Sequence, residues 1–326
     1  MKRPSTGGVL RGLVAVLLTG YIVWRSGPVA ILRAAAGVDA LPILGAVVLV
    51  LADRTLMALR WIVLLRPLSP ALRPPLRVLL RIFFLSTFVG TFLPASVGGD
   101  AVRAYALTRE QVPGAPALAS VLMDRVLGVL SLLLVALVGL CLARDLLADV
   151  LVLGALALTA AVCLVSALLV FSQAAGEFGR RLFERLPWAA VRRVGQRLLS
   201  AVRQYAAHRR DLAIVLAGSI GVQLLRIVQA YLLGRGLRID AGLEVYVAFI
   251  PVILLVMLLP VTINGLGTSQ AAFVWLFGRT GVPTSLAVAL SILFVALGVV
   301  GNLPGGILYA TGGAQRDSSS ALSRKL

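Results

Sequence analysis

The sequence is poor in charged residues, and acidic residues are the scarcest of them. Only 13% of the 326 residues are charged, whereas about a quarter are charged in a typical soluble domain. Asp and Glu number 13 against 31 Lys and Arg, so the formal net charge is +18. Hydrophobic residues make up 60% of the chain, and the mean hydropathy is +0.99. This composition excludes ordinary soluble enzymes, secreted disulfide-rich domains and disordered regulators, and indicates an integral membrane protein.

Histidine, cysteine and lysine are almost absent. Cys141 and Cys163 lie in apolar stretches and His208 is the one histidine, so we expect no disulfide framework, metal site or cofactor. Lysine occurs only as Lys2 and Lys325, and the remaining basic residues are arginines, which bind phosphate in a bidentate way. Because the arginines are spread over loops between apolar runs, membrane lipids with anionic headgroups are the expected partners, and nucleic acid is not.

Apolar runs recur along the whole chain. A transmembrane helix needs about 20 apolar residues, and runs near this length occur at 9–24, 41–65, 78–97, 117–142, 150–171, 212–234, 243–263 and 285–311, with a shorter one at 268–279. The pattern predicts an all-α, polytopic membrane protein of about eight transmembrane helices. The first run resembles a signal peptide without a small-residue cleavage site, so we interpret it as a retained helix. We expect residues 1–315 to form one membrane domain and 316–326 a polar tail.

The longest polar stretch predicts a basic amphipathic helix at 178–210. Nine arginines lie between Arg180 and Arg210, while apolar residues recur at three- and four-residue steps. Such a helix lies on a membrane surface, either as a topology anchor or as a site of headgroup recognition. The excess of arginine places it on the cytoplasmic side of the inner membrane. The basic N-terminus and loop 66–77 also favour that side, which requires the region 78–112 to enter and leave the membrane on one side.

Two segments of the chain resemble each other. One reads FLPASVGGDAVRAY from Phe92, and the other reads LLPVTINGLGTSQAAF from Leu258. In each, an apolar helix ends in Leu-Pro, a small-residue turn follows, and a short helix leads to an arginine and Val-Pro. Pro94 and Pro260 are 166 residues apart, so we interpret 78–142 and 243–311 as an internal repeat. The alternative is chance similarity between stretches rich in glycine and proline.

Proline and glycine together break a helix, and a helix broken at membrane depth can form a re-entrant segment. The freed backbone groups must face protein or a watery cavity, because lipid cannot satisfy them. Paired broken segments at corresponding places indicate a transporter's binding site near the midplane. The N–H groups after Gly98 and after Gly267 are the expected anion-binding groups of the short helices.

Charges within the predicted spans need a reason, since an isolated charge in the bilayer core costs several kcal/mol. Asp53, Arg54 and Arg60 lie in one span, where either an ion pair or a polar pathway would explain them. The other intramembrane charges predict a net-positive cavity near the two glycine turns. The predicted substrate-binding residues are Gly98, Gly99, Asp100, Arg103, Asp124, Arg125, Asn264, Gly265, Gly267, Gln270, Arg226 and Arg81.

No catalytic constellation is visible, and we do not expect an enzyme. His208 lies alone in the basic helix, and Gly98-Gly99-Asp100 is too short for a nucleotide-binding loop. A membrane-embedded transferase acting on lipid-linked substrates, with Asp100 or Asp124 as general base, is one alternative. A membrane partner of a lipid-synthesising enzyme, docked through 178–210, is another.

Several of these motifs resemble those of the lysylphosphatidylglycerol synthase transmembrane-region, or flippase-like, family. They are Phe88-Val89-Gly90, LPASVGGDAVRAY, SVLMDRVLG and LPVTINGLGTSQAAF with Gly281-Val282-Pro283. The family's Gly-Gly-Asp and Asp-Arg motifs correspond to Gly98-Gly99-Asp100 and Asp124-Arg125, and its Asn-Gly-Leu-Gly motif to residues 264–267. Ser269-Gln270 replaces the acidic residue that usually follows.

The resemblance implies a bacterial-type inner-membrane protein that moves lipids between leaflets. In full-length synthases such a region precedes a soluble aminoacyl-tRNA-dependent transferase. No such domain is visible in this sequence, so lysine transfer is not expected, and stand-alone relatives are linked with export of lipids, hopanoids or polyprenyl-glycans. We expect translocation of an anionic or phosphate-bearing lipid by alternating access. Arg103 and Arg125 would neutralise the phosphate, and Asp100 and Asp124 would orient the arginines or carry a coupling proton.

Overall fold

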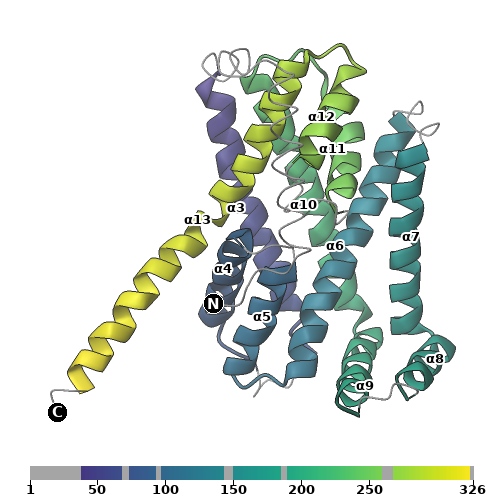
Figure 1. The fold of residues 1–326 in the computed structure, drawn as a ribbon, viewed down its shortest axis with the longest axis vertical. Coiled ribbons are helices and arrows are strands. Elements are labelled where there is room, and N and C mark those ends of the chain that lie inside the picture. Colours follow the sequence, from purple (N-terminus) through teal and green to yellow (C-terminus); the bar gives the residue numbers. More distant parts are fainter. Residues whose placement is uncertain are drawn as a thin grey trace.

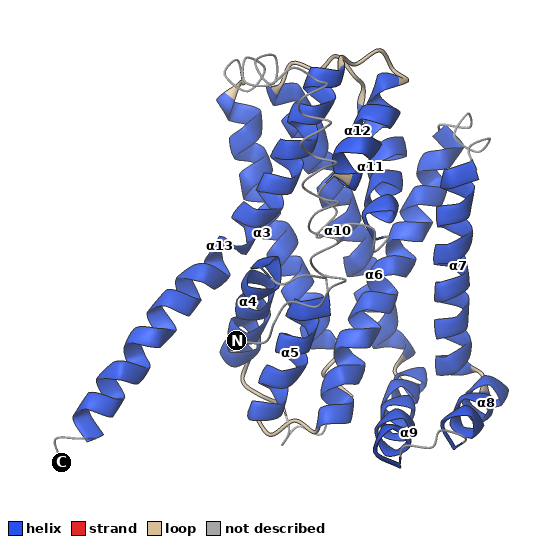
Figure 2. Cartoon of the chain, in the orientation of Figure 1, coloured by secondary structure: helices blue, strands red, loops and turns tan. Residues whose placement is uncertain are grey.

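The computed structural model describes residues 38–67, 73–92, 97–142, 150–184, 189–258 and 267–323. Within these ranges the chain forms α-helices and one 3-10 helix and no strand (Figure 2), which confirms the all-α prediction. The helices are α3 (Ala40–Val63), α4 (Leu76–Phe92), α5 (Val97–Arg109), α6 (Gly114–Leu142), α7 (Val150–Phe171), α8 (Gln173–Glu184), α9 (Ala189–Arg203), η3 (Gln204–Ala207), α10 (Arg209–Gly236), α11 (Leu243–Leu258), α12 (Thr268–Gly278) and α13 (Thr284–Ser323).

Four of these helices are long and apolar enough to cross a membrane, and the chain is accordingly a multi-pass membrane protein. The four spans are Ala40–Val63, Gly114–Cys141, Arg209–Gly236 and Thr284–Ala310, and two shorter apolar helices cover Leu156–Phe171 and Leu243–Leu258. The predicted first helix at 9–24 lies outside the described residues. Helix α13 continues through Ser323 and leaves the bundle (Figure 1), so most of the predicted polar tail is helical.

Helices α4 and α5 form a hairpin that enters and leaves the bundle at the same end. Leu79 at the start of α4 and Leu107 near the end of α5 belong to one buried cluster, which also includes Leu65 after α3 and Ala117 at the start of α6. The beginning of α4 and the end of α5 therefore lie together, beside the end of α3. This arrangement is a helical hairpin, while the position of the region 78–112 relative to the membrane stays a prediction.

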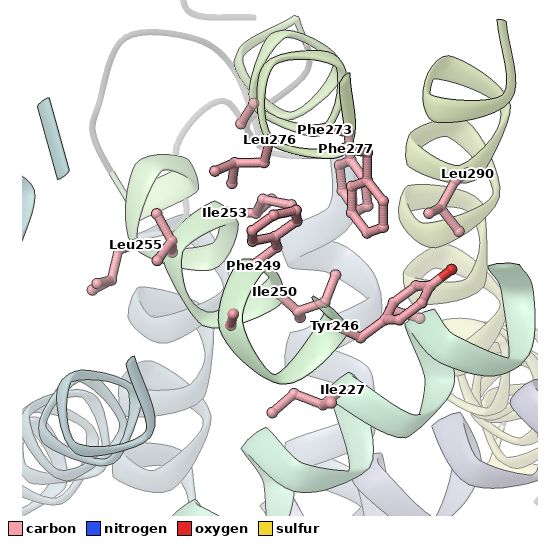
Figure 3. Packing of buried hydrophobic residues seen from close by; sticks show 14 of the residues in the cluster. Ile227, Tyr246, Phe249, Ile250, Ile253, Leu255, Phe273, Leu276, Phe277 and Leu290 are labelled. Carbon is pink, nitrogen blue, oxygen red and sulfur yellow. The ribbon is translucent and has the colours of Figure 1, made fainter. Parts of the chain in front are cut away.

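Helices α11 and α12 make the corresponding unit at the opposite end of the molecule (Figure 1). Tyr246 near the start of α11 and Phe277 at the end of α12 pack with their ring centroids 5.2 Å apart. Phe249 and Phe273 approach Phe277 at 5.5 and 5.7 Å (Figure 3). Aromatic pairs at these separations add stability beyond their buried area, so this cluster fixes α11 against α12.

The two short helices end in the same backbone turn. The N–H of Val112 donates to the C=O of Leu107 at 3.2 Å, and the N–H of Val282 donates to the C=O of Phe277 at 3.2 Å. Gln111 and Gly281, which precede the two valines, have φ of 64° and 79°. A left-handed residue with this bond is a common helix C-cap. The shared turn supports an internal repeat over chance similarity.

Packing between the two halves is reciprocal, and each half includes one helix more than we predicted. Helix α6 packs on α11, α13 packs on α4, and α3 packs along α10. Gly139 of α6 faces the backbone of Val247 in α11, as Gly305 of α13 faces the backbone of Phe84 in α4. We therefore interpret the halves as α3–α6 and α10–α13, with their short-helix units at opposite ends of the molecule (Figure 1).

The basic segment 178–210 is not one helix, contrary to prediction. The described residues form the end of α8, then α9, η3 and the start of α10. Tyr205 anchors the segment, because its buried hydroxyl donates to the backbone C=O of Leu64 at 2.7 Å. Leu64 caps α3, where carbonyl groups lack a helical partner.

Replacing Tyr205 by phenylalanine should weaken this attachment. Burial raises the pKa of the Tyr205 hydroxyl, which therefore stays protonated and able to donate. Loss of the bond is expected to cost about 1 kcal/mol, seen as a lower midpoint of thermal unfolding in detergent. Tyr105→Phe is the matched control, because that side chain is exposed. Equal midpoints for the two variants would contradict the anchoring role.

Candidate functional site

A cavity of about 540 Å³ with several charged residues in its lining lies between the two halves. Residues of α3, α4, α5, α6, α10, α11 and α13 line it. Its size is that of an ordinary small-ligand pocket. Several of the long apolar helices contribute residues from well inside their candidate spans, such as Arg54 and Phe294, so the cavity lies at the level of the middle of these helices.

The deepest charges gather around one carboxylate. Asp124 of α6 forms an ion pair with Arg60 through Oδ1 at 3.1 Å and accepts from Arg103 through Oδ2 at 3.3 Å, and all three side chains are at most 7% exposed. The guanidinium of Arg103 also lies over the ring of Phe83, 4.5 Å from its centroid. Arg60 donates to Ser219 of α10 at 2.5 Å. One buried acid thus holds two arginines from different helices.

A second carboxylate connects the two central helices. Asp53 of α3 pairs with its neighbour Arg54 at 2.9 Å and with Arg226 of α10 at 3.6 Å. Arg54 also donates to the side-chain oxygen of Asn302 in α13 at 2.9 Å, and Asn302 donates to Thr91 of α4 at 2.8 Å. This chain of contacts joins helices from both halves.

A third pair lies nearer the surface. Arg125 of α6 contacts Asp100 of α5 at 2.5 Å, and the arginine side chain is 47% exposed. Asp124 of α6 pairs with Arg103 of α5 in the same way. Each of the two helices thus supplies one acid and one arginine to a pair of ion pairs that joins α5 to α6.

Glycine brings the first of these motifs to the cavity. A Cβ on Gly99 would lie 2.9 Å from the carbonyl oxygen of Ser86, and one on Gly90 would lie 2.9 Å from the Cα of Gly99. Only glycine allows α4 and α5 to approach this closely. The approach brings Arg103 within 3.3 Å of the Ser86 hydroxyl, to which it donates.

Among the described residues that line the cavity, arginine exceeds aspartate by two charges. Five arginines face three aspartates: Arg54, Arg60, Arg103, Arg125 and Arg226 against Asp53, Asp100 and Asp124. Five buried polar side-chain atoms of lining residues have no hydrogen-bond partner within the described chain: Oδ1 of Asp53, Nε of Arg60, Oδ1 of Asp124, Oε1 of Gln223 and Nε2 of Gln229. The cavity therefore has both a positive balance and unused polar atoms.

The opposite wall of the cavity is largely apolar. Helices α11 and α13 contribute Asn302 together with Leu254, Met257, Leu258, Phe294, Val295, Gly298 and Val299. Leu258 is 46% exposed and Val299 is 43% exposed, so this wall continues onto the apolar outer surface of the bundle. The first half supplies most of the charge and the second half supplies most of the apolar surface.

The structure gathers about half of the predicted site residues. Gly99, Asp100, Arg103, Asp124, Arg125 and Arg226 line the cavity, whereas Gly98, Gly267, Gln270 and Arg81 are not among its lining residues. Arg81 is exposed. The side-chain oxygen of Gln270 accepts the N–H of Gly267 at 2.6 Å, so this glutamine caps α12 instead. Asn264 and Gly265 lie outside the described residues.

Other lining residues were not in the predicted set. Asp53, Arg54 and Arg60 had two open interpretations, and the structure supports both, because they are ion-paired and also line the cavity. Arg226 follows Arg60 by 166 residues, which is also the interval between the two Leu-Pro motifs. This spacing could have indicated that Arg60 occupies the position in the first half that corresponds to Arg226. Thr87, Thr91 and Asn302 gave no signal, since single polar residues in apolar runs are common.

The comparison with protein families agrees with the motifs. The model of the lysylphosphatidylglycerol synthase TM region matches residues 8–305. No curated protein and no solved structure matches the chain. Since the matched region covers most of the sequence, this chain belongs to the lysylphosphatidylglycerol synthase transmembrane-region family.

Proposed function

We propose that this protein translocates an anionic, phosphate-bearing lipid between the leaflets of the cytoplasmic membrane. The observation that carries the proposal is the positive cavity at the level of the middle of the long apolar helices, with an apolar wall that reaches the outer surface of the bundle. A headgroup fits the charged wall, while the acyl chains follow the apolar wall into the bilayer. The family's association with lipid translocation agrees with this function.

Alternating access is the mechanism that the fold favours. The two halves contact each other through α6 with α11 and through α13 with α4, and such repeats rock against each other around a fixed site in many transporters. Arg103 and Arg125 would neutralise the phosphate. Asp100 and Asp124 would hold these arginines in place when no lipid is bound, and either could carry a coupling proton.

We place α8 and α9 on the cytoplasmic face. Arg66 at the end of α3 pairs with Asp211 at the start of α10 at 2.9 Å, so the loop after α3 and the basic segment lie at the same end. The exposed arginines there, Arg180, Arg181, Arg192, Arg193 and Arg197, suit anionic lipid headgroups and the positive-inside rule. A lipid-synthesising enzyme could deliver its product to this face.

We propose no catalytic role for the cavity aspartates. Each of the three is ion-paired with at least one arginine, so we assign these carboxylates the role of holding the arginines in place. The chain would therefore move its substrate without changing it.

Leaflet exchange in liposomes tests this function. The purified protein is reconstituted with a fluorescent anionic lipid, and dithionite quenching reports how fast lipid reaches the outer leaflet. Arg125→Ala and Asp100→Asn are each expected to slow exchange at least about tenfold, because each removes half of an ion pair at the cavity. Arg81→Ala is the matched control, since Arg81 is an exposed arginine that does not line the cavity.

Three outcomes separate the hypotheses. Exchange that only the two cavity variants slow would support both the function and the site. Exchange that neither variant affects would keep the function and reject this cavity. No exchange by folded protein would favour a transferase or an assembly partner, and deletion of 178–210 would then test the docking role.

A further inference from the structure

The charge balance of the cavity identifies a narrower class of ligand. We propose that the headgroup it accepts is a dianion, either a phosphomonoester or a diphosphate, and that lipids with a single phosphodiester charge are poorer ligands. This inference rests on the proposed function for its biological setting. Its binding test below does not depend on translocation.

The arginines that line the cavity outnumber the carboxylates that could compensate their charge. Asp124 compensates one of its two arginines, Asp53 compensates one of Arg54 and Arg226, and Asp100 compensates Arg125. Two guanidinium charges remain without a carboxylate among the described lining residues. The intervals 93–96 and 259–266, which adjoin lining residues in the sequence, contain no charged residue that could change this balance.

The apolar surroundings of the cavity make this excess of positive charge costly. Arginine remains protonated in proteins, so the excess charge cannot be removed by losing a proton. An uncompensated charge at membrane depth costs several kcal/mol, and an anion in the cavity removes that cost. A ligand with two negative charges balances the cavity fully, whereas a phosphodiester leaves one positive charge buried.

The hydrogen-bond donors of the cavity also suit a phosphate group with several free oxygens. The excess arginines belong to two separate groups, one around Asp124 and one around Asp53. A phosphomonoester has three terminal oxygens that can accept from such donors, and both groups line the same cavity. Nε of Arg60 and Nε2 of Gln229 are buried donors that have no partner in the described chain, and both belong to lining residues. A diphosphate offers the same charge spread over a longer group.

Binding to the folded protein in detergent tests the charge class directly. Phosphatidic acid, phosphatidylglycerol and phosphatidylcholine with identical acyl chains are titrated at pH 8, where a phosphomonoester is a dianion because its second pKa is about 6. Ligand-induced thermal stabilisation gives a Kd for each lipid. Phosphatidic acid is expected to bind at least about tenfold more tightly than phosphatidylglycerol. Inorganic phosphate is included to separate a lipid site from a site for the free anion.

Variants that reduce the charge excess sharpen the test. Arg226→Gln removes one positive charge, and its preference for phosphatidic acid over phosphatidylglycerol should fall to about threefold or less. Arg125→Gln gives a second reading at a half-exposed position that tolerates substitution more readily. The ratio is read within each variant, so a general loss of affinity does not imitate the result.

The outcomes separate this inference from the proposed function. Equal binding of the two lipids to the unaltered protein, or a ratio unchanged in both variants, would overturn the dianion class. Tighter binding of inorganic phosphate than of phosphatidic acid would also overturn it, in favour of the free anion. If leaflet exchange fails while the preference for phosphatidic acid holds, the dianion site stands and translocation is wrong.

Discussion

Replacing Asp124 by asparagine is expected to destabilise the protein by about 3–5 kcal/mol, because it leaves two buried arginines without their shared counter-ion. Arg60 and Arg103 are each 7% exposed at the side chain, so water cannot take over from the carboxylate. We expect little folded protein in the membrane and a much lower unfolding midpoint in detergent. Asp39→Asn is the control, since the Asp39–Arg238 pair is exposed and exposed pairs contribute little.

A triple variant separates the stability of this cluster from its function. Replacing a whole buried ionic group by apolar side chains is often neutral or stabilising. Arg60→Met combined with Arg103→Met and Asp124→Leu should therefore regain most of the lost stability and yet fail to exchange anionic lipid. A triple variant that exchanges lipid at the original rate would mean that the cluster only supports the fold.

Alanine at Gly305 is expected to force α13 away from α4. A Cβ there would lie 2.0 Å from the carbonyl oxygen of Phe84, and a Cβ on Gly139 would lie 2.5 Å from that of Val247. Backbone atoms cannot move aside as a flexible side chain can, so each substitution should cost about 1–3 kcal/mol or more. Because both glycines lie where the two halves meet, both variants should also slow leaflet exchange.

Gly154→Ala in α7 is the matched control for the glycine variants. A Cβ at Gly154 would meet nothing within 4 Å, and alanine is the better helix former by about 1 kcal/mol. The midpoint of thermal unfolding should stay the same or rise. If Gly305→Ala were equally tolerated, the close backbone contact between α13 and α4 would be wrong.

The sequence predicted the all-α architecture and the apolar spans from local patterns, and the same patterns led to the predictions of a re-entrant hairpin and a repeat. Hydrophobic run length, arginine distribution and the Leu-Pro motifs are each visible within a few tens of residues. It did not show that α3 and α10 extend the repeat, since neither helix contains the Leu-Pro or glycine-turn motif. It also predicted one basic helix where the described residues form α8, α9 and η3, because apolar residues recur at helical spacing in that part of the sequence.

The pairing of the charges could not be predicted because it depends on contacts between distant helices. Asp100 and Arg103 lie three residues apart on one helix and would be expected to face each other, yet each pairs with a residue of α6. Gln270 is polar and adjoins the second glycine turn, as a ligand-binding residue would, but its oxygen caps the helix. Composition near a turn does not distinguish these roles.

The excess of arginine over aspartate in the cavity also concerns the membrane potential. An elementary charge that crosses 100 mV changes its free energy by about 2.3 kcal/mol. In the proposed cycle, a cavity that holds a dianion is electrically neutral, whereas one that returns without lipid is positive. The potential would then act on the return step alone. An energised membrane would set how fast the protein resets between lipids, and would leave the rate of carrying each lipid unchanged.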